Sequence, residues 1–146
     1  MRNILLLVIV AAIFCCGCGK KIVTVTGEVL FEGEPAKDIA VLFEPKSEAK
    51  IVPESGIAIT NSEGRFTLES SSQKRGIEPG SYTVYMNWRN PTSVDDGGAG
   101  PAESGAPPLT SPYRFPAERQ SIVLEVKGSG KNHFVFKVTP EEIRWE

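Results

Sequence analysis

Cysteines at positions 15, 16 and 18 are the most reactive side chains of this sequence, and no other cysteine occurs among its 146 residues. A structural zinc site needs four ligands, usually two separated Cys or His pairs, and the single histidine, His133, is far away in the sequence. A disulfide framework would scatter cysteines through the folded part. Lipid attachment is the chemistry that remains, so we predict no metal site and no cofactor.

The residues ahead of the cysteines favour the same interpretation. Arg2 precedes an uninterrupted apolar segment over 4–14, a pattern typical of an export signal and shorter than the roughly 20 residues of a membrane-spanning helix. Gly17-Cys18 resembles a bacterial lipobox, in which a small residue precedes a cysteine that is acylated on sulfur, for example with palmitate. Two acyl chains anchor a protein stably.

We therefore predict a signal peptide over residues 1–17, folded as a signal helix, and a lipidated anchor with a short linker over 18–21. Cys18 is the expected site of lipid attachment. Cys16 is the alternative acceptor, and an ordinary signal peptide cleaved elsewhere is the remaining possibility. Gly19 is not the aspartate that commonly retains lipoproteins at the inner membrane, so we expect an outer-membrane location facing the periplasm or the surface.

The charge balance excludes one class of partner. The chain carries 16 Lys and Arg against 18 Asp and Glu, for a net charge of −2. Nucleic-acid-binding domains usually show a strongly basic balance, so no nucleic-acid partner is expected. Residues 18–146 have the length of one domain.

Beyond the anchor, apolar residues alternate with polar ones in short runs that end at Gly, Pro, Asn or Ser, which is the pattern of strands. Seven such runs occur, at 22–35, 39–45, 56–61, 65–70, 80–88, 121–128 and 132–138. They predict an all-β chain, a seven-stranded antiparallel Greek-key β-sandwich over 22–138. In the run 80–88, Tyr82, Val84, Met86 and Trp88 share one face and are expected in the core, which places Tyr85 on the opposite face.

Three stretches carry a resemblance to a known family: "VTGEVLFEGEPAKDIAVLFEP", "TNSEGRFTL" and "IEPGSYTVYM". They resemble the carboxypeptidase regulatory-like, or transthyretin-like, sandwich domain over residues 22–88, with 120–138 as the last two strands. The whole chain is similar to small bacterial lipoproteins that carry this module. The matching residues are structural, so the resemblance implies a fold rather than an activity. The related hydrolases use several histidines and a Tyr-Arg-Gly-Ser tail, whereas this chain ends Ile143-Arg144-Trp145-Glu146.

Residues 89–119 form a Pro- and Gly-rich segment that predicts an irregular loop. Within it, Tyr113, Arg114 and Phe115 either pack back on the sandwich or offer a contact surface, and packing is favoured. In the C-terminal tail, 139–146, a short helix is expected at Thr139, with Trp145 at the edge of the sandwich.

Taken together, the residues predict a protein that is not an enzyme. His133 is expected at the surface, and no paired carboxylates or nucleophile–base spacing stand out. The leading hypothesis is a lipid-anchored cell-envelope module with a structural, adhesion or protein-interaction role, which contacts the membrane through its lipid. Its sheet faces and edges are expected to contact an envelope protein or glycan, with the 89–119 loop as the main variable contact surface. The alternative is a small carbohydrate-binding module in which an exposed aromatic such as Tyr85 stacks on sugar rings.

Overall fold

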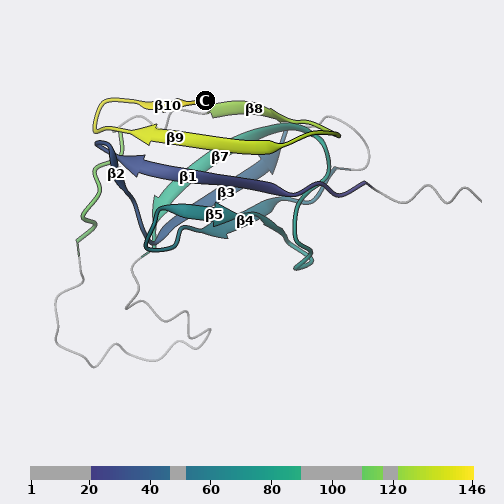
Figure 1. Cartoon of the computed structure of the whole chain (residues 1–146), viewed down its shortest axis with the longest axis horizontal. Helices are drawn as coiled ribbons and strands as arrows, with labels where there is room; N and C mark the ends of the chain where they lie inside the picture. Colours follow the sequence, from purple (N-terminus) through teal and green to yellow (C-terminus); the bar gives the residue numbers. More distant parts are fainter. Residues whose placement is uncertain (1–20, 47–51, 90–109, 117–121) are drawn as a thin grey trace, which may run out of the picture.

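The computed structural model describes residues 21–46, 52–89, 110–116 and 122–146 (Figure 1). Within these ranges the chain forms strands and turns and no helix, and the strands build two sheets packed against each other. The expectation of an all-β sandwich is confirmed. Each of the seven runs that the alternation pattern predicted contains a strand.

Two five-stranded sheets make up the sandwich. The first sheet has the order β10-β9-β1-β2, with β5 also paired to β1. Its strands are β1 (Val25–Phe31), β2 (Glu34–Pro35), β5 (Arg65–Thr67), β9 (Asn132–Val138) and β10 (Ile143–Trp145). The second sheet has the order β6-β4-β3-β7-β8. Its strands are β3 (Ile39–Pro45), β4 (Gly56–Ile59), β6 (Glu69–Ser70), β7 (Gly80–Trp88) and β8 (Ile122–Val126).

The expectation of a wholly antiparallel sandwich is wrong at the centre of the first sheet. Strands β1 and β9 are parallel over their whole length, with Val25 opposite Asn132 and Phe31 opposite Val138. The connection between sheets explains the direction. The chain leaves the second sheet along β8 and turns into β9 at the end where it first enters β1 (Figure 1), so both strands start from the same end.

The run 65–70 forms two short strands in different sheets rather than one. Strand β5 pairs with β1 in the first sheet, and β6 pairs with β4 in the second. Leu68, between them, is fully buried, and its N–H donates to the carbonyl of Val25 at 2.9 Å. This residue therefore marks a corner at which the chain passes from one sheet to the other.

The core lies between the two sheets and follows the alternation of the strands. Tyr82 and Val84 are buried as expected, whereas Met86 and Trp88 are half-buried and pack against the margin of the core. The largest fully buried side chains come from both sheets and from the segments that connect them: Val25, Val29, Ile39, Val41, Phe43, Leu68, Ile77, Tyr82, Val84, Val126, Phe136 and Val138. Gly27, in the middle of β1, has no side chain, and the ring of Phe66 occupies the space where one would lie.

The predicted helix at Thr139 is wrong, because a tight turn takes its place. The Thr139 N–H donates to the carbonyl of Glu142 at 2.9 Å, and the Thr139 hydroxyl accepts from the N–H groups of Glu141 and Glu142. This turn reverses the chain into β10, which adds to the edge of β9. Trp145 lies at that edge, 46% exposed, with its ring edge-on to Phe134 at 6.3 Å between centroids.

Tyr82 combines complete burial with one hydrogen bond at the start of β7. Its hydroxyl donates to the backbone carbonyl of Glu78 at 2.7 Å. Burial, with a smaller effect from the charge of Glu78, raises the pKa of Tyr82 to about 12. An unfolded tyrosine titrates near 10, so the native state holds this proton more tightly than the unfolded state does.

The free energy of unfolding should therefore fall as the pH rises from about 10 to about 12, because the contribution of Tyr82 is complete below the unfolded pKa and is lost through the native one. Tyr82→Phe should remove this part of the pH dependence and cost about 1 kcal/mol at neutral pH for the lost hydrogen bond. Urea unfolding at several pH values measures both effects. Tyr85→Phe is the control and should keep the wild-type slope; an unchanged slope in Tyr82→Phe would contradict the assignment.

Candidate functional site

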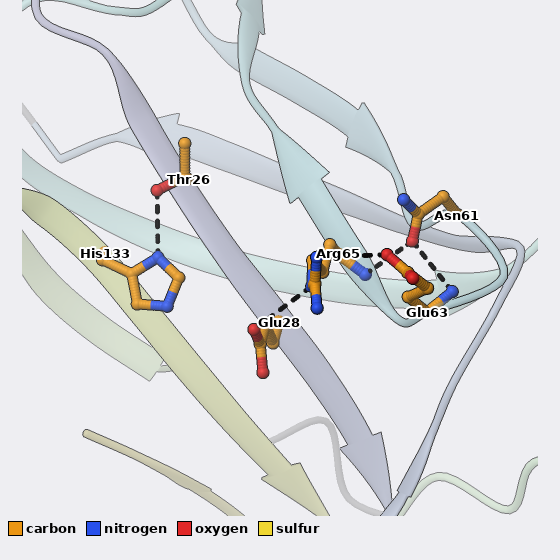
Figure 2. Close-up of polar contacts among 6 residues, drawn as sticks. All are labelled: Thr26, Glu28, Asn61, Glu63, Arg65 and His133. Atoms are coloured by element: carbon orange, nitrogen blue, oxygen red, sulfur yellow. Dashed lines mark hydrogen bonds and ion pairs between the residues drawn. The ribbon is translucent and has the colours of Figure 1, made fainter.

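The outer face of the first sheet is polar, and its side chains form hydrogen bonds and ion pairs with one another (Figure 2). Thr26 on β1 lies beside His133 on β9, with 3.0 Å between the threonine Oγ1 and the histidine Nδ1. Arg65 on β5 approaches Glu28 with its Nε at 3.6 Å and Glu63 with its Nη1 at 3.1 Å. The charged groups drawn in Figure 2 are therefore engaged with neighbours of the same face.

The turn before β5 places Arg65 for these contacts. The side-chain oxygen of Asn61 accepts from the N–H groups of Glu63 and Arg65, both at 3.0 Å. Gly64 has a φ of 71°, a left-handed conformation that glycine adopts without strain. Asn61 and Gly64 favour such a turn, but it does not close a hairpin, because β4 before it belongs to the second sheet and β5 after it belongs to the first.

His133 is half-buried rather than fully at the surface. Within the described ranges, its imidazole ring forms one hydrogen bond, with the Thr26 hydroxyl. Nucleophilic catalysis needs a base that is itself oriented by a third group, together with donors for the developing oxyanion. No hydrogen bond or ion pair between described residues adds a carboxylate to this pair. The geometry fits a cross-strand contact that supports the parallel β1–β9 pairing.

The outer face of the second sheet is chemically different. Ile57 is 50% exposed, Ile59 is 42% exposed and Val123 is 44% exposed. The strand register places Ile57, Leu42 and Tyr85 in one row across β4, β3 and β7. We use the term apolar outer face for six residues: Ala40, Leu42, Ile57, Ile59, Tyr85 and Val123.

The packing behind β4 explains why its large residues point outward. Gly56, Ala58 and Thr60 face the core. A Cβ on Gly56 would lie 2.7 Å from Cγ2 of Ile77, and the Thr60 hydroxyl donates to the Ala36 carbonyl at 2.6 Å. The inner side of β4 therefore accepts only small residues. The two isoleucines of this strand must lie on the outside.

Sequence reasoning did not single out this surface. The signal was present in the run "GIAIT", in which small residues alternate with isoleucines. Period-two alternation shows that two faces differ, but it does not say which face is buried when the inward residues are Gly, Ala and Thr. Tyr85 was singled out, and the structure places it on the outer face of β7, opposite to Tyr82, as expected.

Tyr85 lies at the centre of this surface and is half-buried. Leu42 is its partner across the sheet, and Thr83 and Asn87 flank it along β7. Carboxylates occupy the rim: Glu69 is opposite Ile57, and Glu44 and Glu125 are exposed on β3 and β8. None of these three glutamates takes part in an ion pair between described residues.

The other proposed contact residues are placed elsewhere. The Tyr113 hydroxyl accepts from the Lys37 N–H at 2.9 Å, and its ring meets that of Phe31 edge-on at 5.5 Å. Phe115 also packs against the core, whereas Arg114 is exposed. The favoured interpretation of this segment, packing on the sandwich, agrees with these contacts. Cys18 and the parts 90–109 and 117–119 of the predicted loop lie outside the described residues.

A hollow of about 280 Å³ lies where the chain enters the sandwich, lined by Ile22, Glu54, Ser70, Lys74, Ile77 and Glu78. The Ser72 hydroxyl donates to Oε2 of Glu54 at 2.6 Å. Hydrogen bonds from Ser72 and then Ser70 lower the pKa of Glu54. This carboxylate is therefore ionised and already bound by the serines at the end of β6 and in the turn that follows it. Among the residues that the structure describes, no group of three or more His, Cys, Asp or Glu is placed to hold a metal ion.

Within the described part of the chain, no helix is long and apolar enough to cross a membrane. Comparison with protein-family models, with curated proteins and with solved structures found no match to this chain.

Proposed function

We propose that this chain is a non-enzymatic, lipid-anchored protein of the cell envelope that binds another envelope protein through the apolar outer face of its second sheet. The lipobox-like residues around Cys18 support the anchor. The outer membrane is the expected location. The observation that carries the binding function is the exposure of Ile57, Ile59 and Val123 around Tyr85 on one sheet face.

The contrast with the first sheet strengthens this argument. Both sheets expose one face, but the outer face of the first is covered by partnered polar groups such as Thr26 and His133. A contiguous exposed apolar patch, rimmed by polar residues, marks interaction sites in soluble domains. Of the six large apolar side chains that are exposed among the described residues, three lie on this face: Ile57, Ile59 and Val123. The other three are Ile22, Val52 and Trp145, of which Trp145 lies at the edge of the first sheet.

We also propose how the strands of the two-sheet sandwich are connected. We propose a Greek-key connection of seven principal strands, of the carboxypeptidase regulatory-like or transthyretin-like kind, preceded by a signal helix that is removed. The "TNSEGRF" turn and the Pro79-Gly80 start of β7 support this assignment. In this arrangement the 90–109 segment is an additional contact candidate.

Carbohydrate binding is the second candidate, because Thr83 and Asn87 flank Tyr85 on the same face of β7. An aromatic ring with nearby hydrogen-bonding groups suits a sugar. The neighbours of Tyr85 across the sheet, Leu42 and beyond it Ile57, are apolar, and this favours a protein partner. Loss of envelope-polysaccharide retention in a folded Tyr85→Ala variant would support the sugar alternative instead.

Site-specific crosslinking in cells tests the protein-binding function. A photoreactive residue at Ile57 or at Val123 should capture the same envelope protein, and Ile59→Ser should reduce both products, because all three positions belong to one surface. The same probe at Thr67, which is exposed on the first sheet, is the matched control and should not capture that protein. Equal capture from all three positions, or capture from none, would contradict the proposal.

A further inference from the structure

The sandwich has two chemically different ends. One end holds the start of β1, the start of β7 and the connection from β8 to β9 (Figure 1), and the backbone bridge between Val23 and Ile77 ties the entering chain to it. We call this the entry end. The opposite end holds the end of β1, the start of β3 and the turn before β5, and we call it the far end.

The loops of the entry end are basic. Among the described residues they carry six exposed cations and two carboxylates, the latter being Glu54 and Glu78. The cations come from four separate segments of the chain: Lys21, Lys46, Lys74, Arg75, Lys127 and Lys131. No ion pair between described residues involves any of the six. The rim glutamates Glu44, Glu69 and Glu125 belong to strands β3, β6 and β8 rather than to these loops, and the backbone of Glu69 is bridged to that of Arg75.

The loops of the far end are acidic. They carry five carboxylates against three cations over the described residues. The carboxylates are Glu32, Asp38, Glu63, Glu141 and Glu142, and the cations are Lys37, Arg89 and Arg114. The small net charge of the whole chain therefore conceals a separation of charge along the length of the sandwich.

The position of the anchor decides which end meets a membrane. Val23 is five positions after Cys18, and five steps of at most about 3.6 Å each span no more than about 18 Å. Val23 is fixed to Ile77 by two backbone hydrogen bonds, at 2.9 and 3.1 Å. A lipid on Cys18 would therefore hold the basic entry end, and not the acidic far end, within reach of the headgroups.

We propose that the entry end is a binding surface for anionic lipid headgroups, so that the sandwich stands on the membrane with its acidic far end directed away. This inference rests on the proposed lipid anchor. Cations near an anionic membrane surface are attracted to it, and the attraction decays within a Debye length of about 10 Å at 0.1 M salt. The lipid anchor would keep the entry end close to the membrane. The charge separation would orient the sandwich, because an anionic surface attracts the basic entry end and repels the acidic far end.

Energy transfer between the protein and the membrane tests the orientation. The lipidated protein is purified from membranes with a single dye, attached in one preparation to Ser129→Cys at the entry end and in the other to Ser62→Cys at the far end. Each is reconstituted into vesicles with an acceptor on the headgroups, made of phosphatidylcholine alone or mixed with phosphatidylglycerol. In anionic vesicles we expect stronger transfer from position 129 than from position 62. The difference should shrink in neutral vesicles and at roughly 1 M salt, where the Debye length is about 3 Å.

Matched charge variants complete the design. Lys74→Gln, Arg75→Gln and Lys127→Gln together should abolish the extra transfer that phosphatidylglycerol produces, whereas Lys37→Gln, Arg114→Gln and Arg144→Gln together should leave it intact. Equal transfer from both positions in both kinds of vesicle, from protein whose intact mass includes the acyl chains, overturns this inference and leaves the anchor standing. Protein from membranes whose mass shows no acyl chain overturns the anchor itself, and with it the inference.

Discussion

Replacing Gly27 by alanine should destabilise the protein by about 3 kcal/mol, at the upper end of the range for overpacked cores. A Cβ at this position would lie against the backbone oxygen of Phe134 and 2.5 Å from Cζ of Phe66. The oxygen belongs to the parallel β1–β9 pair and cannot move without opening that ladder. Small domains have a total stability of about 5–15 kcal/mol, so one methyl group should remove a large part of it.

Urea unfolding of Gly27→Ala beside Gly128→Ala measures this effect. A Cβ on Gly128 would meet only Pro79 Cγ at 3.5 Å, which is an ordinary van der Waals contact, so this control should unfold close to the wild-type midpoint. Similar midpoints for the two variants would show that β1 and β9 are not as close as described. If Gly27→Ala cannot be purified alone, the same variant in the presence of a stabilising osmolyte gives the comparison.

Truncating Phe43 to alanine should cost about 3–5 kcal/mol, the range measured for buried Phe residues. Phe43 is fully buried in β3 and touches aromatic rings from both sheets, with centroid distances of 6.1 Å to Tyr82 and 6.1 Å to Phe134. Its removal opens a cavity at the contact between the sheets, which the rigid strands around it cannot close.

Ile57→Ala is the control for this prediction, because it also shortens an apolar side chain of the second sheet, but one that is 50% exposed. Its cost should stay within about 1 kcal/mol, since part of the side chain is already in water. Phe43→Leu should fall between the two. Equal costs for Phe43→Ala and Ile57→Ala would mean that the outer face of this sheet is as well covered as its inner face.

Local pattern was sufficient to predict most of the sandwich. Period-two alternation located every long strand, and it placed Tyr82 and Tyr85 on opposite faces of β7. Turn chemistry identified the turn at Asn61–Gly64, although the strands on either side of it join different sheets. These features depend on residues that are close together in the sequence, so they can be predicted from local patterns without knowledge of long-range contacts.

The failures have a common physical origin in contacts between distant segments. The tail was expected to be helical, but the exposed edge of β9 offered unpaired backbone groups, and residues 143–145 joined it as β10. Strands β1 and β9 are parallel because the chain between them runs through the second sheet and returns along β8 to the end at which β1 starts. The apolar outer face was missed because Ile77, two strands away in sequence, occupies the space inside β4.

The β1–β9 pair also sets the order in which this molecule can fold. Thr26 and His133 are 107 positions apart, so the central pair of the first sheet cannot form before almost the whole chain is free to fold. Pairings of such long range carry the loop-closure entropy that makes β-sandwiches fold in milliseconds to seconds. If the chain is exported with its N-terminus leading, β1 crosses the membrane first and can pair with β2 and β5, but the edge of β1 that pairs with β9 stays open until β9 arrives. A lipid on Cys18 would then hold a chain whose first strand has one edge open to pairing with a neighbouring molecule.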